Sequence, residues 1–216
     1  GVKVNLQEGQ NFSTKLGSDG GKIDYTVITD LGKAGSTTGK DLQGINGGLA
    51  KNYVLGADID ASATATWNKS GQSYLGFKPL GGDNLALFTG SRFDGLGHSI
   101  AGLTINRPNE NYGGLFGRTS GSDIRNVHLQ DGVVNGKQYA GGLVGYSSNG
   151  TISNSSASSD IIVRTGSGSA FAGGLVGYSS SNVTISNSSA SGDVLMNSTS
   201  TSTSTTTTYA SAGGLV

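Results

Sequence analysis

The chain of 216 residues lacks cysteine altogether and has few charged residues. Without cysteine there is no disulfide framework and no Cys-ligated zinc or iron–sulfur site. Only 13% of the residues are charged, against about 25% in ordinary globular chains, and 14 basic side chains balance 14 acidic ones. Because binding to phosphates requires an excess of basic residues, we expect no nucleic-acid partner. No window approaches the ~20 apolar residues of a membrane-spanning helix.

Glycine is the residue in excess, and it recurs in a repeated motif. The chain contains 38 glycines, more than twice the usual share of ~7%. A Gly-Gly-Leu motif followed by an apolar residue recurs at intervals of about 28, 32 and 40 residues, within the range typical of solenoid proteins. The copies begin at Gly113, Gly141, Gly173 and Gly213. The chain begins without Met or an apolar signal region and stops within the last copy, so we interpret it as a mature product or an excised piece.

A second element follows each complete copy of the motif. The segment Thr151–Ser158 is repeated letter for letter at Thr184–Ser191, and Asp123–Val127 is a weaker counterpart. A third, short apolar piece closes each unit. Three short extended segments in about 30 residues, separated by Gly, Asn and Ser turns, predict one coil of a right-handed parallel β-helix. Amphipathic runs of helical spacing, which a helical solenoid needs, are missing from this half of the chain. The predicted fold class is therefore all-β.

Stacked coils place equivalent residues ~4.8 Å apart, so the repeat predicts files of identical side chains. One file would be a core stack of leucines and another a ladder of asparagine amides, beside paired glycines that allow a close backbone approach. The predicted structural repeat residues are Gly113, Gly114, Leu115, Gly141, Gly142, Leu143, Gly173, Gly174, Leu175, Asn126, Asn154 and Asn187.

The two halves of the chain differ in composition. Residues 1–110 carry most of the charges, the only Trp and both prolines, and we expect irregular entry coils there. Residues 111–216 would form the repeat coils, truncated within a repeat, with a Ser/Thr-rich insertion at 197–208 on one edge of the solenoid. One short helix is expected near residues 41–49, with Asp41 as its N-cap.

Two carboxylates are the best candidates for chemistry. Asp58 and Asp60 flank Ile59 and would point to one side of a strand, at a separation similar to that in inverting glycosidases; Asp94 and His98 are candidates for a further acid or base. The alternative is that these residues bond the backbone of their own turns. The Asp58–Asp60 pair offers too few oxygens for Ca²⁺, and His98 has no clustered partner for zinc. We expect no catalytic residue, metal or other cofactor.

A set of short segments carries a family likeness: Asp41–Asn46, Tyr53–Ser62, Trp67–Asn68, Gly76–Phe77, Phe88–Gly90, Phe93–His98, Gly102–Pro108 and Gly113–Gly117. Together they resemble the sequences of large secreted bacterial adhesins of the filamentous haemagglutinin type. The later Gly-Gly-Leu motifs look like the GLUG repeat of bacterial surface proteins. It implies two-partner secretion through an outer-membrane export pore and a long β-helical rod. The family's N-terminal export domain has no match here, which implies a segment of the shaft.

These observations predict a structural or binding segment of a bacterial surface or biofilm-matrix adhesin. Its expected location is secreted, at the outer-membrane cell surface or in the extracellular matrix. Its expected partners are an extracellular polysaccharide, a host cell-surface glycan or a host protein. The alternatives are a polysaccharide-degrading β-helix enzyme and a self-assembling extracellular filament, because open β-helix ends are unpaired edges.

Asn-X-Ser/Thr triplets are frequent, and the likeness to hexose-modified adhesins makes some of them glycosylation candidates. We expect Asn149, Asn182 and Asn197, at turns, to be the acceptors. Asn154 and Asn187 would be poorer acceptors if they stack inside a ladder.

Overall fold

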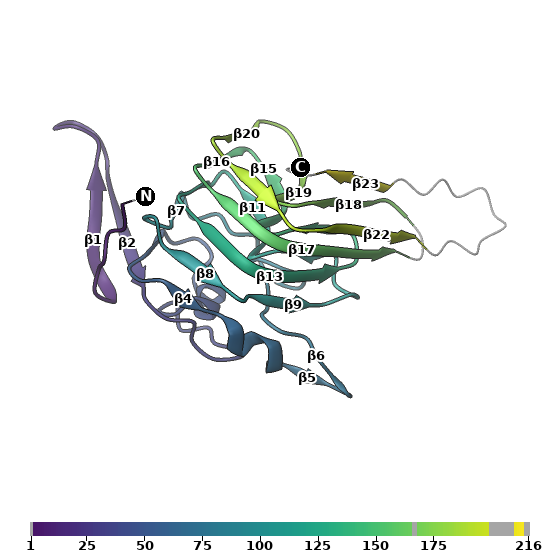
Figure 1. The fold of residues 1–216 in the computed structure, drawn as a ribbon. Coiled ribbons are helices and arrows are strands. Elements are labelled where there is room, and N and C mark those ends of the chain that lie inside the picture. The colour runs from purple at the N-terminus through teal and green to yellow at the C-terminus, as the bar shows by residue number, and fades with distance from the viewer. Residues whose placement is uncertain (1, 166–167, 199–209, 214–216) are drawn as a thin grey trace.

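The predicted parallel β-helix is confirmed: the computed structural model is a parallel β-solenoid of about six turns. It describes residues 2–165, 168–198 and 210–213. Figure 1 shows the coils stacked in sequence order from one end to the other. The strands are β1 Gly9–Lys15, β2 Lys22–Ile28, β3 Tyr53–Leu55, β4 Ile59–Asp60, β5 Lys69–Ser70, β6 Ser73–Tyr74, β7 Arg92–Asp94, β8 Ser99–Ala101, β9 Thr104–Asn106, β10 Tyr112–Gly113, β11 Phe116–Ser120, β12 Asp123–Arg125, β13 His128–Gly136, β14 Tyr139–Gly141, β15 Val144–Ser148, β16 Gly150–Ser153, β17 Ser156–Thr165, β18 Ala170–Gly173, β19 Val176–Ser179, β20 Val183–Ser186, β21 Ser189–Ser191, β22 Val194–Ser198 and β23 Ala210–Gly213, and the 3₁₀ helices are η1 Gln43–Gly47 and η2 Ser62–Thr66.

Each repeat coil is one circuit of four strands. The circuit of β14, β15, β16 and β17 lies directly under that of β18, β19, β20 and β21 with β22. Residues at corresponding positions of the repeat are strand partners, as Ile152 is of Ile185 and Tyr146 is of Tyr178. The pairing is parallel along the stack, so a residue recurs at the same place on each successive coil.

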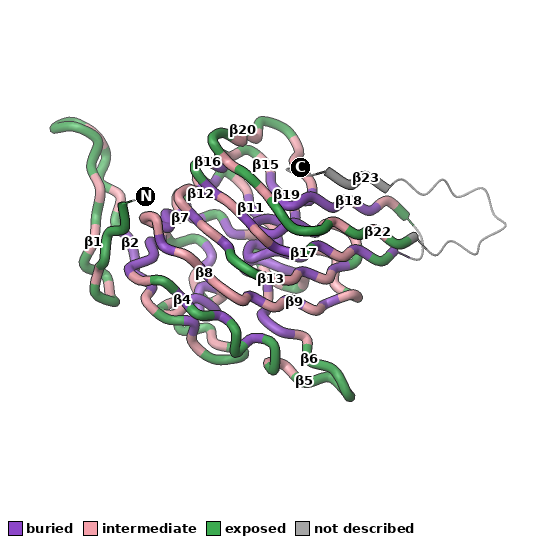
Figure 2. The backbone as a smooth tube through the Cα atoms, viewed as in Figure 1, coloured by how far each residue is buried: buried purple, intermediate pink, exposed green. Residues whose placement is uncertain are grey.

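The coils enclose a continuous apolar core (Figure 2). Leu115, Leu143 and Leu175 form the predicted file, and all three are completely buried. Backbone hydrogen bonds link the coils here: the Leu143 amide donates to the Leu175 carbonyl, and the Phe116 amide, next to Leu115, donates to the Leu143 carbonyl, each over 2.9 Å. Full burial of each such side chain contributes about 1.5–3 kcal/mol to folding.

The glycines of the repeat lie where the backbones of neighbouring coils approach most closely. A Cβ on Gly142 would come within 2.7 Å of the Gly174 carbonyl oxygen, and one on Gly141 would overlap the Val144 carbonyl oxygen. Only glycine fits at such a contact. Around the motif the first coil has one residue fewer than the next, since Gly113 pairs with Ala140 whereas Phe116 pairs with Val144.

The N-terminal end departs from the coil pattern. Strand β1 pairs antiparallel with β2, and this hairpin stands at one end of the stack (Figure 1). The helix expected near residues 41–49 is present as η1, but its N-cap position is Leu42 and not the expected Asp41. The Asp41 carboxylate lies one residue earlier and accepts the Gly44 amide over 2.7 Å. None of the helices in the described ranges is long and apolar enough to cross a membrane. The Ser/Thr-rich insertion lies, after Ser198, outside the described residues.

Candidate functional site

The turns of the repeat coils carry asparagines in the left-handed backbone region. Asn126, Asn154 and Asn187 have φ angles of 55°, 49° and 47° and occupy the same turn of three successive coils. Asparagine tolerates this region better than most residues because its short amide can bond locally. The turn therefore explains why the residue recurs, and stacking explains why the three side chains form one file.

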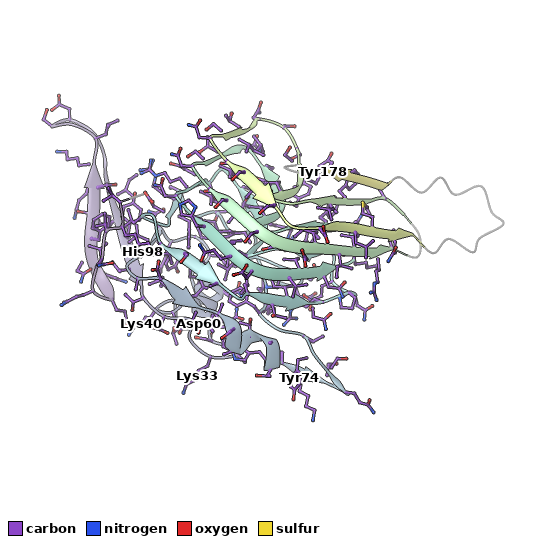
Figure 3. All side chains as sticks on the ribbon, viewed as in Figure 1. Lys33, Lys40, Asp60, Tyr74, His98 and Tyr178 are labelled. Carbon is purple, nitrogen blue, oxygen red and sulfur yellow. The ribbon has the colours of Figure 1, made fainter. Side chains whose placement is uncertain are left out.

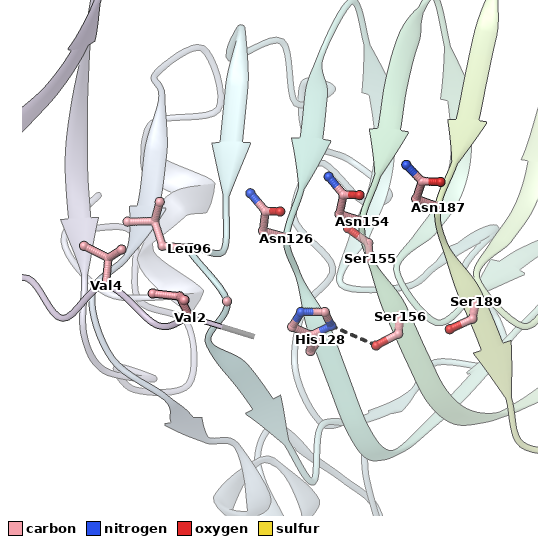
Figure 4. Close-up of a pocket in the computed structure, with 11 residues that line it drawn as sticks. Val2, Val4, Leu96, Asn126, His128, Asn154, Ser155, Ser156, Asn187 and Ser189 are labelled. Atoms are coloured by element: carbon pink, nitrogen blue, oxygen red, sulfur yellow. Dashed lines mark hydrogen bonds between the residues drawn. The ribbon is translucent and has the colours of Figure 1, made fainter.

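This asparagine file borders an open groove of about 610 Å³ (Figure 4). A second polar file runs beside it, in which His128 pairs with Ser156 and Ser156 pairs with Ser189. The groove is lined by Val2, Val4, Leu96, Gly97, Asn126, His128, Asn154, Ser155, Ser156, Asn187 and Ser189. On each coil the two files offer one side-chain amide and either the imidazole or a hydroxyl group. We call this groove the asparagine groove.

None of the described residues that line the asparagine groove carries a full charge at neutral pH. His128 is its only titratable lining residue, and burial, followed by the positive charges of the N-terminus and Lys3, lowers the pKa of the imidazole. The neutral ring can share a hydrogen bond with the Ser156 hydroxyl, with Nδ1 and Oγ 2.9 Å apart. A ligand suited to this surface is itself uncharged and rich in hydrogen-bonding groups.

One end of the asparagine groove is apolar and is formed by the N-terminal segment. Val2 is 87% exposed and lies near Leu96 (Figure 4). Backbone bonds attach the segment to the coils: the Val4 amide donates to the Leu96 carbonyl, and the Leu6 amide donates to the Gly56 carbonyl over 3.0 Å. The groove therefore joins a hydrogen-bonding floor to an apolar rim.

The carboxylates singled out from the sequence do not converge on this groove. Asp58 accepts hydrogen bonds from the Lys3 ammonium over 2.6 Å and from the Ser99 amide over 2.9 Å. The contact with Lys3, and next that with Ser99, holds the pKa of the Asp58 carboxyl well below its usual range. A general acid needs the opposite shift. Asp58 is thus a fixed anion that attaches the N-terminal segment to the coils.

The other three candidates are also committed to local contacts. Asp60 accepts from the Ser62 hydroxyl and amide, which lowers the pKa of its carboxyl. Asp94 is buried, forms an ion pair with Arg125 over 2.9 Å and accepts a hydrogen bond from the side-chain amide of Asn126 over 2.8 Å. His98 is 1% exposed and contacts Asp58 and the Val4 carbonyl; Figure 3 labels it apart from Asp60. Across the described ranges, no group of three or more His, Asp or Glu side chains is placed to hold a metal ion.

The glycosylation candidates lie on the surface. Asn149 and Asn182 stack at the second asparagine turn of the coil, where the Asn182 amide donates to the Asn149 oxygen over 3.3 Å, and Asn197 is exposed in β22. Asn154 and Asn187 are exposed as well. Stacking therefore does not shield the last two from solvent, and which asparagines carry a glycan stays a prediction.

Sequence reasoning missed a double file of aromatic rings beside the glycine motif. Tyr112, Tyr139 and Phe171 stack on successive coils, with centroids 5.4 and 5.5 Å apart, and Tyr146 stacks on Tyr178 at 5.4 Å. The Tyr112 ring also lies 4.8 Å from the Arg118 guanidinium. The ring faces are covered by one another, so the files fasten coils rather than offer a free aromatic platform. The sequence feature that could have revealed these files is the aromatic residue on each side of both Gly-Gly-Leu-Val-Gly motifs.

Comparison with known proteins agrees with this architecture. Residues 136–162, which run from the end of β13 through β16 into β17, match the model of the GLUG motif. The chain is 43% identical over 122 residues, 53% of its length, to Halomucin from Haloquadratum walsbyi. The match covers 1% of that protein, so the chain spans a very small part of this relative. No solved structure matches the chain. The chain is thus a parallel β-solenoid that carries a GLUG motif and resembles a short stretch of a very long protein.

Proposed function

We propose that the chain is an extracellular structural and binding segment, a length of rod within a much longer cell-surface protein. The observation that carries this proposal is the in-register stacking of equivalent residues from coil to coil. Each coil bonds mainly to its neighbours, so a solenoid lengthens by ~4.8 Å with every added coil without a new core design. The likeness to 1% of Halomucin supports a small part in a very long chain.

The asparagine groove supplies the binding part of this function. We infer that it contacts an extended neutral polysaccharide. Its amide and hydroxyl files repeat at the strand spacing of ~4.8 Å, which is about the length of one pyranose unit along a chain. Uncharged groups meet sugar hydroxyls without the desolvation cost of full charges. Each further coil would add one more set of contacts, so the affinity would grow with the length of the rod.

Adhesion, a place in a biofilm matrix and export through an outer-membrane pore are finer parts of the same proposal. They follow from the resemblance to filamentous haemagglutinin-type adhesins and stay predictions. A host glycan or host protein is the alternative partner, and its binding would use the same exposed polar files.

The experiment compares two matched pairs of substitutions. The Asn154→Gly and Asn187→Gly changes remove two amides of the groove, and glycine adopts the positive φ of both turns without strain. The control, Asn149→Gly with Asn182→Gly, makes the same change at the other turn of the same two coils. Binding is measured to immobilised dextran, mannan and β-glucan, with protein made in a host that does not glycosylate asparagine.

We expect the first pair to lose about tenfold in affinity for a retained glycan, equivalent to ~1.4 kcal/mol, and the control to bind as the parent does. Equal losses in both pairs would show that the groove is not the contact surface. If the parent protein binds none of the neutral glycans, the neutral-glycan part of the proposal is wrong. The rod part of the proposal is tested separately, by the shape of the protein in small-angle scattering.

A further inference from the structure

A second groove, of about 650 Å³, lies between the β1–β2 hairpin and the outer face of the solenoid. Four of its lining residues are basic and none is acidic, in a chain whose net charge is zero. The full lining is Thr14, Lys15, Leu16, Gly20, Gly21, Lys22, Ile23, Arg92 and Arg125. We call it the basic groove. It shares no lining residue with the asparagine groove.

Two fixed guanidinium groups form one wall of the basic groove. Arg92 on β7 contacts Asp123 on β12, and Arg125 on β12 contacts Asp94 on β7; each contact joins Nε to a carboxylate oxygen over 2.9 Å. These reciprocal pairs use the Nε side of each fork. Arg92 Nη1 also donates to the Tyr25 hydroxyl over 3.4 Å, and Arg125 Nη1 lies 3.7 Å from an Asp123 carboxylate oxygen. The Nη2 atom of each guanidinium is left to face a ligand, and arginine offers its N–H groups in a planar arrangement that suits carboxylate and sulfate oxygens.

The opposite wall holds two lysines that face each other. Lys15 on β1 and Lys22 on β2 are direct cross-strand partners in the antiparallel hairpin. Like charges in this position destabilise a strand pair. The Lys22 ammonium has a partial counter-charge in Asp24, 2.7 Å away, but both lysines stay exposed. An anion between them would relieve the repulsion, so the hairpin is arranged for a negatively charged ligand.

We propose that the basic groove binds the carboxylate or sulfate groups of an anionic polysaccharide. The four cations come from four strands and are spread along an open groove, an arrangement that suits an extended chain bearing several charges. The anion chemistry follows from the four basic lining residues, three of which also pair with a carboxylate outside the lining. The choice of a polysaccharide as the carrier rests on the proposed extracellular function.

The test uses the whole chain and a pair of charge reversals. Lys15→Glu with Lys22→Glu changes the groove without touching the Arg92–Asp123 and Arg125–Asp94 pairs. The control, Lys33→Glu with Lys69→Glu, changes the net charge by the same amount at exposed positions elsewhere; Lys33 points into solvent in Figure 3. The probes are polygalacturonate for carboxylate, dextran sulfate for sulfate, neutral dextran and double-stranded DNA, with inorganic sulfate as a small competitor.

We expect the parent to bind one of the two anionic glycans at low salt, more tightly than neutral dextran, and to weaken as ionic strength rises. The groove variant should lose at least about tenfold in affinity and the control less than about twofold. Equal losses would overturn the proposal, because they would show general charge attraction. Tighter binding of DNA through the same lysines would also overturn it. Direct binding of inorganic sulfate by the parent, lost in the groove variant and without binding of either anionic glycan, would reject the polysaccharide ligand.

Discussion

Tyr139 lies face to face with Phe171, with ring centroids 5.5 Å apart and ring planes within 2° of parallel. Tyr112 stacks on the opposite side of Tyr139 with planes 8° apart. The file therefore fastens three coils at the corner where glycines bring their backbones together. Aromatic pairs of this kind contribute about 0.5–1.5 kcal/mol each beyond the area they bury.

Removing the central ring should loosen this corner. We expect Tyr139→Ala to lower the free energy of unfolding by about 2–4 kcal/mol, because two stacked pairs and a half-buried ring are lost together. Tyr139→Phe keeps both stacks and should stay within about 1 kcal/mol of the parent. Urea denaturation measures both variants. A similar loss in the two would show that the hydroxyl group, rather than the stacked ring, matters.

Alkaline pH should destabilise the solenoid through Tyr53. Its ring is fully buried, its hydroxyl donates to the Gly48 carbonyl over 2.8 Å, and burial raises the pKa of the phenol to about 12. The unfolded chain ionises near pH 10, so the folded state retains a proton that the unfolded state has lost. The stabilising contribution is complete below pH 10 and is lost as the pH rises from about 10 to 12.

The measurement is the urea midpoint between pH 8 and 12. Tyr53→Phe has nothing to ionise at this position, and its curve should fall less steeply than that of the parent. Burial and the neighbouring tyrosines also raise the pKa of Tyr139, so part of the decline should remain in the variant. Parallel curves for parent and variant would refute the assignment to Tyr53.

The repeat coils could be predicted from the sequence because the duplicated segments and the spacing of the leucines both indicate the same stacking of coils. The duplicated Thr-Ile-Ser-Asn segments fix the register of β16 on β20, and the spacing of the leucines places them in one core file. A helix near Asp41 was also foreseen, although not its 3₁₀ geometry, which five residues cannot specify. A repeat indicates which residues occupy the same position on successive coils, but it does not indicate the backbone conformation of the turns between them.

The grooves could not be foreseen in the same way. Lys15 and Arg125 are more than a hundred positions apart, and only the return of the hairpin toward the coils places them at one groove. The asparagines could be recognised as a file, but the sequence alone did not show their positive φ angles or the exposure of Asn154 and Asn187. Strand β1 was missed because its antiparallel pairing lies outside the repeat.

The glycine motif gives a direct test of the close approach between coils. Gly141→Ala would place a methyl group against the Val144 carbonyl oxygen and the Gly177 amide nitrogen of the next coil. Since both are backbone atoms that cannot rotate away, we expect a loss of about 1–3 kcal/mol or more in the free energy of unfolding. Gly21→Ala is the control, because a Cβ there meets nothing within 4 Å. Comparable stabilities of the two variants would argue against the stacking distance.

The turn asparagines should respond to substitution according to backbone conformation. Asn154 has a φ angle of 49°, and alanine in this region costs about 1–2 kcal/mol whereas glycine costs little strain. We therefore expect Asn154→Ala to unfold at lower urea than Asn154→Gly. Asn11→Ala, at an exposed position of β1 outside the left-handed region, should change stability by less than about 0.5 kcal/mol. If alanine and glycine at residue 154 are equally stable, the turn does not require the left-handed conformation. The recurrence of asparagine at this turn would then need another explanation. Glycan binding by the Asn154→Gly variant tests a binding role independently of stability.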